Sequence, residues 1–303
     1  MQELPLIRTI GFVIKHRQPE AALFAKEIVQ FLLTQNVAVI FADESKTLAK
    51  KIESLYQEKI NLQILPKSDL MMQCDIIVVL GGDGTFLSVA RLIRERSVPI
   101  MGVNMGRLGF LTEIKQSEAI PTLQSLIQGV PPLLNHRHLL EVRLQRKGEI
   151  IYEGPVVNDA VISKGAIARI IGMNVWVNDH WVHQVRADGI IISTPAGSTA
   201  YALAAGGPIV EPTLPALILA PICAHSLTLR PLVLPDSAQV KICLNDRPGH
   251  VLLTLDGQDA IDMKEDDIVI VKCYKKHSLK IIASSDRDFF SLLREKLKFG
   301  VRD

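Results

Sequence analysis

The spacing of apolar residues changes near residue 138 and divides the chain into two kinds of pattern. In the first half, short uncharged runs alternate with stretches whose apolar residues recur at helical spacing. The clearest run is 75–80, which is β-branched and uncharged after Asp75. Other strands are expected at 10–14, 37–41 and 98–103, and helices from Pro19, over 46–56 and from the glycine-rich stretch at 81 to about Arg96. Strands that alternate with helices in this way predict a parallel sheet covered on both faces.

The second half has many short strand patterns instead. They are expected at 139–144, 150–152, 156–163, 173–177, 180–185, 189–192, 239–244, 251–255 and 268–273. Two pairs between such runs, Lys147-Gly148 and Asn178-Asp179, consist of residues that tolerate the positive φ of a hairpin turn. The predicted fold class is therefore an α/β domain with a parallel sheet, followed by a β-rich, mostly antiparallel and sandwich-like domain.

Two helical segments interrupt or follow the β-rich pattern. Ser198 precedes Thr-Ala-Tyr-Ala-Leu-Ala-Ala and is expected to cap a helix there, and Gly206 is expected to end it. The last segment, 286–299, is amphipathic and is expected to pack back on the first domain. The expected domains are 1–137, 138–282 and, for the C-terminal helix, 283–303.

Composition and charge exclude several classes of protein. The chain has 303 residues, 48% of them hydrophobic, and 34 basic against 32 acidic residues give a net charge of +2. These values exclude a disordered chain, and the charge gives no argument for a nucleic-acid or membrane partner. Aromatic residues make up only 5%, so a surface for stacking bases would be small.

Cysteine use and the uncharged stretches predict a soluble, cytoplasmic protein. No two cysteines form a CxxC pair, and their spacings fit neither a zinc site nor a compact disulfide framework. Buried, reduced thiols are expected at Cys74, Cys223, Cys243 and Cys273. The N-terminus lacks the order of regions found in a signal peptide. Glycine, proline, serine and threonine interrupt the longest uncharged stretches, 189–210 and 212–229, so neither fits a membrane-spanning helix.

The first group of residues with a chemical signal is Gly81-Gly82-Asp83-Gly84-Thr85, between a buried strand and a helix. Ligands gather at the carboxyl ends of parallel strands, and glycines there let backbone N–H groups approach a phosphate. A carboxylate in such a loop would repel phosphate, which favours a specific task for Asp83: it takes a proton from a hydroxyl nucleophile or holds Mg²⁺. In the alternative, Asp83 only caps the helix. The spacing is neither that of a dinucleotide fingerprint nor that of a P-loop.

A second group, Ser-Thr-Pro-Ala-Gly-Ser-Thr-Ala-Tyr at 193–201, follows the expected strand at 189–192. Its small residues allow close approach of a ligand, and its hydroxyl groups can form hydrogen bonds. A capped helix packed by alanines is the alternative. A third set stands at strand ends, where each residue alone is more often a turn residue or a surface charge: Asn158, Asp159, Arg169, Arg186, Asp188, Asp256 and Gln258.

Taken together, three segments resemble the signatures of bacterial NAD kinases: 81–85, Asn158-Asp159, and Thr-Pro-Ala-Gly-Ser-Thr-Ala-Tyr at 194–201. Their order and separation agree with that family, and the resemblance extends over about 10–299. The first loop is only moderately specific, because diacylglycerol kinases, sphingosine kinases and phosphofructokinases carry similar loops. The segment around Ser198 is highly specific.

The resemblance implies an ATP-dependent phosphorylation of the 2′-hydroxyl on the adenosine ribose of NAD, which gives NADP. Asp83 would be the general base. The other residues that the resemblance places at the nucleotide sites are Gly81, Gly82, Gly84, Thr85, Asn158, Asp159, Arg169, Arg186, Asp188, Ser198, Thr199, Ala200, Tyr201, Ala202, Leu203, Ala204 and Gln258. In similar enzymes, an arginine at the position of Arg186 goes with preference for NAD over NADH. Ala196 stands where many relatives have threonine and is left out of the site.

The cofactors and partners follow from the same resemblance. ATP is the expected phosphate donor and NAD the substrate. The chain has no P-loop lysine, so a divalent cation, Mg²⁺, is expected to neutralise much of the triphosphate charge; ATP and water would hold it, and no protein ligand is predicted. A homodimer or homotetramer is implied, with active sites completed across subunits. No nucleic-acid or membrane partner is expected.

Two other functions stay open at this point. A lipid kinase of the diacylglycerol type would share the loop at 81–85, but the chain has no basic amphipathic segment and 194–201 does not fit it. A non-catalytic NAD-binding sensor would keep the fold without the reaction, and the intact Asp83 argues against it.

Overall fold

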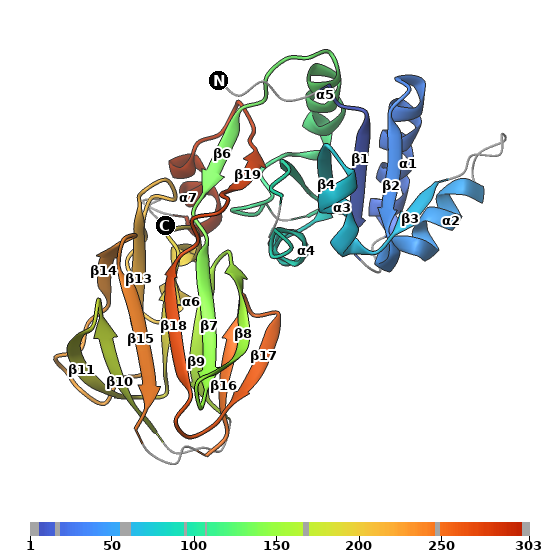
Figure 1. Ribbon diagram of the computed structural model, residues 1–303. Helices are drawn as coiled ribbons and strands as arrows, with labels where there is room; N and C mark the ends of the chain where they lie inside the picture. Colours follow the sequence, from blue (N-terminus) through green and yellow to red (C-terminus); the bar gives the residue numbers. More distant parts are fainter. Residues whose placement is uncertain are drawn as a thin grey trace. The chain divides into compact units, whose positions relative to one another are not determined.

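The computed structural model describes residues 6–15, 19–54, 62–93, 96–106, 108–165, 170–245 and 249–298. Its contacts divide the chain into two compact units. Unit 1 comprises Met1–His136 and Leu279–Asp303, and unit 2 comprises Arg137–Ser278. Unit 1 contains one sheet and unit 2 contains two (Figure 1). Each unit also has its own hydrophobic core.

Unit 1 is built on a seven-stranded sheet in the order β3-β2-β1-β4-β5-β19-β6. The strands are β1 (Thr9–Ile14), β2 (Ala38–Ala42), β3 (Gln63–Leu65), β4 (Ile76–Gly81), β5 (Ile100–Asn104), β6 (Leu134–Arg137) and β19 (Leu279–Ile282). The helices are α1 (Pro19–Thr34), the 3-10 turn η1 (Asp43–Ser45), α2 (Lys46–Ser54), α3 (Lys67–Gln73), α4 (Asp83–Ala90), α5 (Gln116–Ile127) and α7 (Phe289–Leu297). The pairs from β3 to β19 are parallel, which confirms the predicted parallel sheet.

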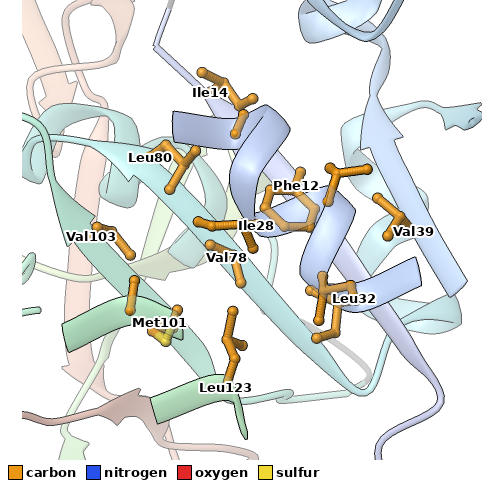
Figure 2. Close-up of a cluster of buried hydrophobic side chains, with 14 of the residues drawn as sticks. Phe12, Ile14, Ile28, Leu32, Val39, Val78, Leu80, Met101, Val103 and Leu123 are labelled. Atoms are coloured by element: carbon orange, nitrogen blue, oxygen red, sulfur yellow. The ribbon is translucent and has the colours of Figure 1, made fainter. Parts of the chain in front are cut away.

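The central strand β4 is buried at all six positions, as a parallel strand with both faces covered requires. Alternate residues face alternate sides. Figure 2 shows Val78 and Phe12 from β4 and β1 turned toward Ile28 and Leu32 of α1, and all four side chains belong to one buried cluster. Ile77 and Val79, on the other side of β4, are fully buried as well, so the β-branched run at 75–80 follows from burial on both faces.

Several elements of unit 1 have no counterpart in the predicted pattern. They are β3, α3, α5, β6 and β19. β3 has three residues, none fully buried, and α5 carries Pro121 in its interior, which hides a helical pattern. The helix expected to run to about Arg96 ends earlier, at Ala90.

Unit 2 contains two six-stranded sheets, β11-β10-β15-β18-β7-β8 and β14-β13-β12-β9-β16-β17. The strands are β7 (Leu140–Arg146), β8 (Glu149–Val156), β9 (Asp159–Lys164), β10 (Ile171–Val177), β11 (His180–Ala187), β12 (Gly189–Ser193), β13 (Ala216–Ile222), β14 (Leu232–Pro235), β15 (Gln239–Leu244), β16 (Val251–Leu255), β17 (Asp259–Met263) and β18 (Ile268–Cys273). Two short helical turns, η2 (Ala196–Thr199) and α6 (Tyr201–Ala204), follow β12.

All described strand pairs of unit 2 are antiparallel, and one core joins its two sheets. Val142 and Val240 of one sheet lie in the same cluster as Ile190 and Leu253 of the other. The predicted sandwich-like fold class is therefore confirmed. Both predicted hairpin turns have positive φ as well: 49° and 85° at Lys147-Gly148, 49° and 64° at Asn178-Asp179.

All four cysteines are free thiols, but they are not all buried. Cys74 and Cys273 are buried and Cys243 is half-buried. Cys223 is exposed, and its backbone has a φ of 47°. The expectation of burial is wrong at Cys223 and only partly met at Cys243. Among the residues that the structure describes, no helix has the length and apolar character that crossing a membrane requires.

A buried ion pair holds the turn between β17 and β18. Arg146 donates from Nε and Nη2 to the two carboxylate oxygens of Asp267, at 2.9 and 2.8 Å. The N–H of Lys264 donates to the same carboxylate at 2.8 Å, and Asp267 has no exposed surface. The pair between Arg143 and Glu153 is nearly as short, 3.0 Å, but 32% of the Arg143 side chain and 41% of the Glu153 side chain are exposed.

These two pairs give a matched stability prediction. Asp267→Ala should lower the free energy of unfolding by about 3 kcal/mol, because it strands a partly buried guanidinium. Glu153→Ala should cost less than about 1 kcal/mol, because water already solvates that pair. Both tryptophans, Trp176 and Trp181, lie in unit 2, so tryptophan fluorescence during urea unfolding reports on this unit. Equal losses in the two variants would contradict the argument from burial.

Candidate functional site

The glycine-rich stretch stands at the carboxyl end of β4. β4 ends at Gly81, Gly82 is the N-cap residue of α4, and α4 begins at Asp83. A Cβ on Gly81 would lie 2.7 Å from the Thr85 hydroxyl, so glycine is needed there for packing. A Cβ on Gly82 or Gly84 would meet nothing within 4 Å. The glycines at 82 and 84 therefore leave open space above the first turn of α4, where a phosphate can approach backbone N–H groups.

The carboxylate of Asp83 binds the segment that follows β5. Its Oδ1 accepts hydrogen bonds from the N–H groups of Leu111 and Thr112, both at 3.1 Å, and from the Thr112 hydroxyl at 3.0 Å. Its Oδ2 accepts one from the N–H of Phe110 at 2.9 Å and lies 3.7 Å from Lys296 Nζ. Since a carboxylate has about four lone-pair positions, Oδ2 keeps room for another donor. Asp83 does not cap its own helix, so that alternative is wrong.

Two glycines, Gly102 and Gly109, let the segment at 110–112 come this close to Asp83. A Cβ on Gly109 would lie 1.9 Å from Asp83 Oδ1, and one on Gly102 would lie 2.9 Å from the backbone of Leu111. The backbone at 110–112 can therefore donate to Asp83 only because Gly102 and Gly109 have no side chain. Sequence reasoning missed this segment. Its signal was a second glycine-containing stretch, Gly106 and Gly109, directly after the expected strand at 98–103.

In unit 2 the carboxylate of Asp256 orders the backbone in a similar way. It accepts hydrogen bonds from the N–H groups of Val157, Asn158 and Asp159, at distances from 2.7 to 3.1 Å. These bonds replace sheet pairing between the end of β8 and the start of β9. The expected single strand at 156–163 is therefore wrong: Val156 ends one strand and Asp159 begins the next.

A cavity of about 320 Å³ opens beside these residues within unit 2. It is lined by Asn158, Asp159, Val161, Ser163, Ala200, Tyr201, Thr254, Asp256 and Gly257. Asp159 is only 4% exposed. Burial, and then the charge of Asp256, raise the pKa of Asp159 to about 7. The cavity thus contains a carboxyl group that changes charge near neutral pH.

The segment after β12 differs from its predicted form. Ser198 is fully buried in η2, and its hydroxyl bonds to both the N–H and the carbonyl of Val210, at 3.1 and 3.2 Å. It does not cap a helix. The backbone turns at Ala200, where φ is −98° and ψ −129°, and α6 begins at Tyr201. Gly206, with φ of 79°, follows the end of α6 closely, as predicted.

The structure brings four of the predicted nucleotide-site residues together at this cavity: Asn158, Asp159, Ala200 and Tyr201. Ala202 is fully buried in a small core with Ile191 and Val210. Six other predicted residues of unit 2 do not line the cavity: Thr199, Leu203, Ala204, Arg186, Asp188 and Gln258. Arg186 is exposed on β11, and Asp188 forms an ion pair of 2.9 Å with Lys164. Arg169 lies outside the described residues.

Sequence reasoning missed several residues near these sites: Thr112, Lys164, Ser163, Thr254 and Lys296. Thr254 stands on β16, two positions before Asp256, which directly follows the strand, and both residues line the cavity. That spacing was the available signal. No signal along the chain connected Lys296, in the last helix, with Asp83.

The fold and the two local sites are typical of nucleotide-binding proteins. A glycine-rich loop ends the central strand of a parallel sheet, and a β-rich unit holds a cavity lined by both polar and apolar residues. Family models then identify the group. Residues 10–130 match the ATP-NAD kinase N-terminal domain, and 157–283 match the ATP-NAD kinase C-terminal domain. An NAD kinase from Geotalea daltonii is 40% identical over 296 residues, which is 98% of this chain and 100% of that protein. The chain belongs to the NAD kinase family, whose members are phosphotransferases.

Solved structures agree with this assignment. A yeast NADH kinase, solved in complex with NADH, has a TM-score of 0.90 and 27% identity, and the match covers 99% of this chain and 90% of that one. An NAD kinase from Archaeoglobus fulgidus, solved with ATP, has a TM-score of 0.71 and 23% identity over 95% of this chain and 99% of that one, which shows a shared fold. The resemblance drawn from the three segments is confirmed.

The raised pKa of Asp159 predicts a pH-dependent stability. The unfolded chain releases this proton near pH 4, whereas the folded chain holds it to about pH 7. Between these values the unfolded state binds fewer protons, so this group lowers stability as pH rises, by about 1.4 kcal/mol per pH unit. Asp159→Asn removes the effect. Its stability relative to the parent protein should therefore rise from pH 5 to pH 7 and level off above, measured by tryptophan fluorescence in urea. A constant difference over this range would refute the shift.

Proposed function

We propose that the protein transfers the γ-phosphate of ATP to the 2′-hydroxyl on the adenosine ribose of NAD, with Asp83 as the general base. The observation that carries this proposal is the carboxylate of Asp83 at the carboxyl end of β4, beside the open space above α4, whose Oδ2 accepts one hydrogen bond whereas Oδ1 accepts three. Family membership supports the reaction. The yeast relative solved with NADH supports a dinucleotide as the acceptor, and the archaeal one solved with ATP shares the fold.

In the proposed reaction, Asp83 Oδ2 takes the proton of the ribose 2′-hydroxyl. The ribose oxygen then forms a bond to the γ-phosphorus of ATP, the bond to the bridging oxygen breaks, and ADP leaves. The three hydrogen bonds on Oδ1 hold the carboxylate in one orientation, so the base is positioned before the substrate binds. N–H groups in the first turn of α4, next to Gly82 and Gly84, are placed to bind phosphate oxygens.

Unit 2 supplies the nucleotide contacts in this proposal. Asn158 and Asp159 present an amide and a carboxyl group to the cavity, and Tyr201 adds a ring and a hydroxyl. A carboxyl group with a pKa of about 7 can donate or accept a hydrogen bond near neutral pH. We propose, from the resemblance alone, that Arg186 favours NAD over NADH as the substrate. Nucleotide contacts by Arg169, Asp188 and Gln258 are proposed on the same ground.

A divalent cation is part of the proposal, and the donor groups indicate how it is held. Oδ1 of Asp83 already accepts three hydrogen bonds, and the remaining room on Oδ2 is assigned to the substrate hydroxyl. Among the described residues, the one cluster of three His, Cys, Asp or Glu side chains that could hold a metal belongs to unit 2 and includes no residue of this loop. The loop therefore fits a cation bound by the phosphates of ATP and by water. When bound, the cation neutralises charge on the triphosphate.

Three further expectations stay predictions: Mg²⁺ as the cation, the homodimer or homotetramer, and the location in the cell. The alternative functions gain no support. The relatives that match nearly the whole chain are NAD kinases, whereas a lipid kinase or a non-catalytic sensor would rest on the loop at 81–85 or on the fold alone.

Replacing the base tests the proposed reaction. Asp83→Asn keeps the size of the side chain and removes its capacity to take a proton, so the rate of NADP formation should fall by about 10²- to 10⁴-fold. A strictly NADP-dependent dehydrogenase reports the product in the presence of NAD, ATP and Mg²⁺. Thr112→Val removes one of the hydrogen bonds on Oδ1 and keeps the base, so its kcat should fall far less. Near-normal turnover of Asp83→Asn would remove Asp83 from its role.

The cavity is tested separately from the base. Asn158→Ala removes an amide that faces the cavity, so the KM for NAD should rise about tenfold, the worth of one good hydrogen bond. The KM for ATP should not change. Asn174→Ala is the matched control, because Asn174 is a half-buried asparagine of unit 2 outside the cavity lining. Equal effects of the two substitutions on the KM for NAD would contradict the assignment.

A further inference from the structure

Three side chains with metal-binding atoms converge in unit 2 outside the cavity beside Asp159. His138, Asp236 and Cys273 each offer one ligand atom, and these atoms all lie within 4.8 Å of one another. Cys273 is buried, and the other two are partly exposed. None of the three lines the cavity, and none has a part in the proposed reaction.

Backbone pairing places two of these side chains together. Cys273 is the last residue of β18 and pairs with Leu140 at the start of β7. One residue further, the N–H of Tyr274 donates to the carbonyl of Leu139 at 2.8 Å, which continues the pairing past the ends of both strands. His138, next to Leu139, is thereby held beside the end of β18.

The third side chain comes from the other sheet. Asp236 directly follows β14, and its N–H donates to the carbonyl of Pro215 at 3.1 Å. The next turn is closed by a hydrogen bond of 2.9 Å from the N–H of Ala238 to the carbonyl of Pro235. The ligand atoms thus come from three backbone segments that hydrogen bonds already position.

We propose that His138, Asp236 and Cys273 bind one zinc ion, with water in the fourth position. An imidazole nitrogen, a carboxylate oxygen and a thiolate sulfur are the three kinds of ligand that zinc takes in proteins. Bond lengths of about 2.0 to 2.3 Å in a tetrahedral site put ligand atoms about 3.5 Å apart. Rotation of the two partly exposed side chains is the adjustment that the observed separation requires.

The chemistry around the cluster agrees with a cation. In the part of the chain that the structure describes, no hydrogen bond or ion pair ties the three side chains to other residues. A divalent cation would offset the unfavourable interaction between a Cys273 thiolate and the Asp236 carboxylate beside it. The set also differs from the all-oxygen ligands that Mg²⁺ prefers, so this site is distinct from the cation carried by ATP.

Cobalt substitution tests the site without reference to activity. The full chain, freed of metal by a chelator and dialysed, is titrated with Co²⁺ in the absence of nucleotide. One Co²⁺ per chain should give a near-ultraviolet thiolate-to-cobalt charge-transfer band, and Zn²⁺ should displace it. The band should disappear in Cys273→Ser. In His138→Gln the affinity for Co²⁺ should fall by at least about 10- to 100-fold. Removing only the hydrogen-bond partner of a metal ligand has an effect of that size, and here the ligand itself is removed.

Two matched thiol variants separate this site from adventitious binding. Cys243→Ser changes a half-buried thiol of unit 2, and Cys223→Ser changes the exposed one; both should keep the band. A band that disappears in Cys223→Ser and survives in Cys273→Ser would show an adventitious ion only. The absence of any charge-transfer band in the parent protein would also overturn the proposal.

Stability gives a second readout that does not depend on the cobalt spectrum. An ion that binds only the folded state raises stability with its concentration. Micromolar Zn²⁺ should shift the urea midpoint of tryptophan fluorescence upward in the parent protein and in Cys243→Ser. It should not do so in His138→Gln, whose altered side chain is partly exposed and leaves the core intact. An equal shift in all three proteins would contradict binding at this cluster.

Discussion

A carboxylate that accepts backbone N–H groups from a distant segment is the constraint on which both local sites depend. Asp83 takes the N–H groups of 110–112 in unit 1, and Asp256 takes those of 157–159 in unit 2. In each unit the bound segment has left the sheet, so its N–H groups would otherwise need water in a partly buried place. The carboxylates satisfy these groups and fix the loops that carry the polar side chains of each site.

For Asp83 this arrangement separates two tasks between two oxygens. Oδ1 carries three hydrogen bonds and Oδ2 only one. A proton taken up on Oδ2 would leave the lone pairs of Oδ1 in use, so the segment at 110–112 can stay bound while the base changes its protonation state. The same residue can therefore be both a structural acceptor and the proposed base. The effect of replacing Asp83 on turnover therefore has to be compared with the effect of replacing Thr112, because Thr112 contributes to the structural task alone.

The fold was predictable where burial sets the pattern, and less so elsewhere. The run at 75–80 predicted β4 because both faces of a central parallel strand are apolar, and Lys147-Gly148 predicted its turn because of the required positive φ. The break between Val156 and Asp159 was not predictable, because a residue about a hundred positions later makes it. Ser198 was misassigned for the same kind of reason. Its hydroxyl has two partners on Val210, and a local capping rule cannot include them.

The candidate sites follow the same division. The glycine-rich loop and Asn158-Asp159 are contiguous in the sequence, so motifs could predict them. The segment at 109–112 and Lys296 join the first site only through folding, and His138, Asp236 and Cys273 lie far apart along the chain. Cysteine spacing indicated no zinc site, because a spacing rule considers only residues that are close in sequence. An antiparallel sandwich brings together strand ends that are far apart in sequence. A search for ligands in such a fold therefore has to start from strand register: Cys273 opposite Leu140 already puts His138 within two residues of the thiol.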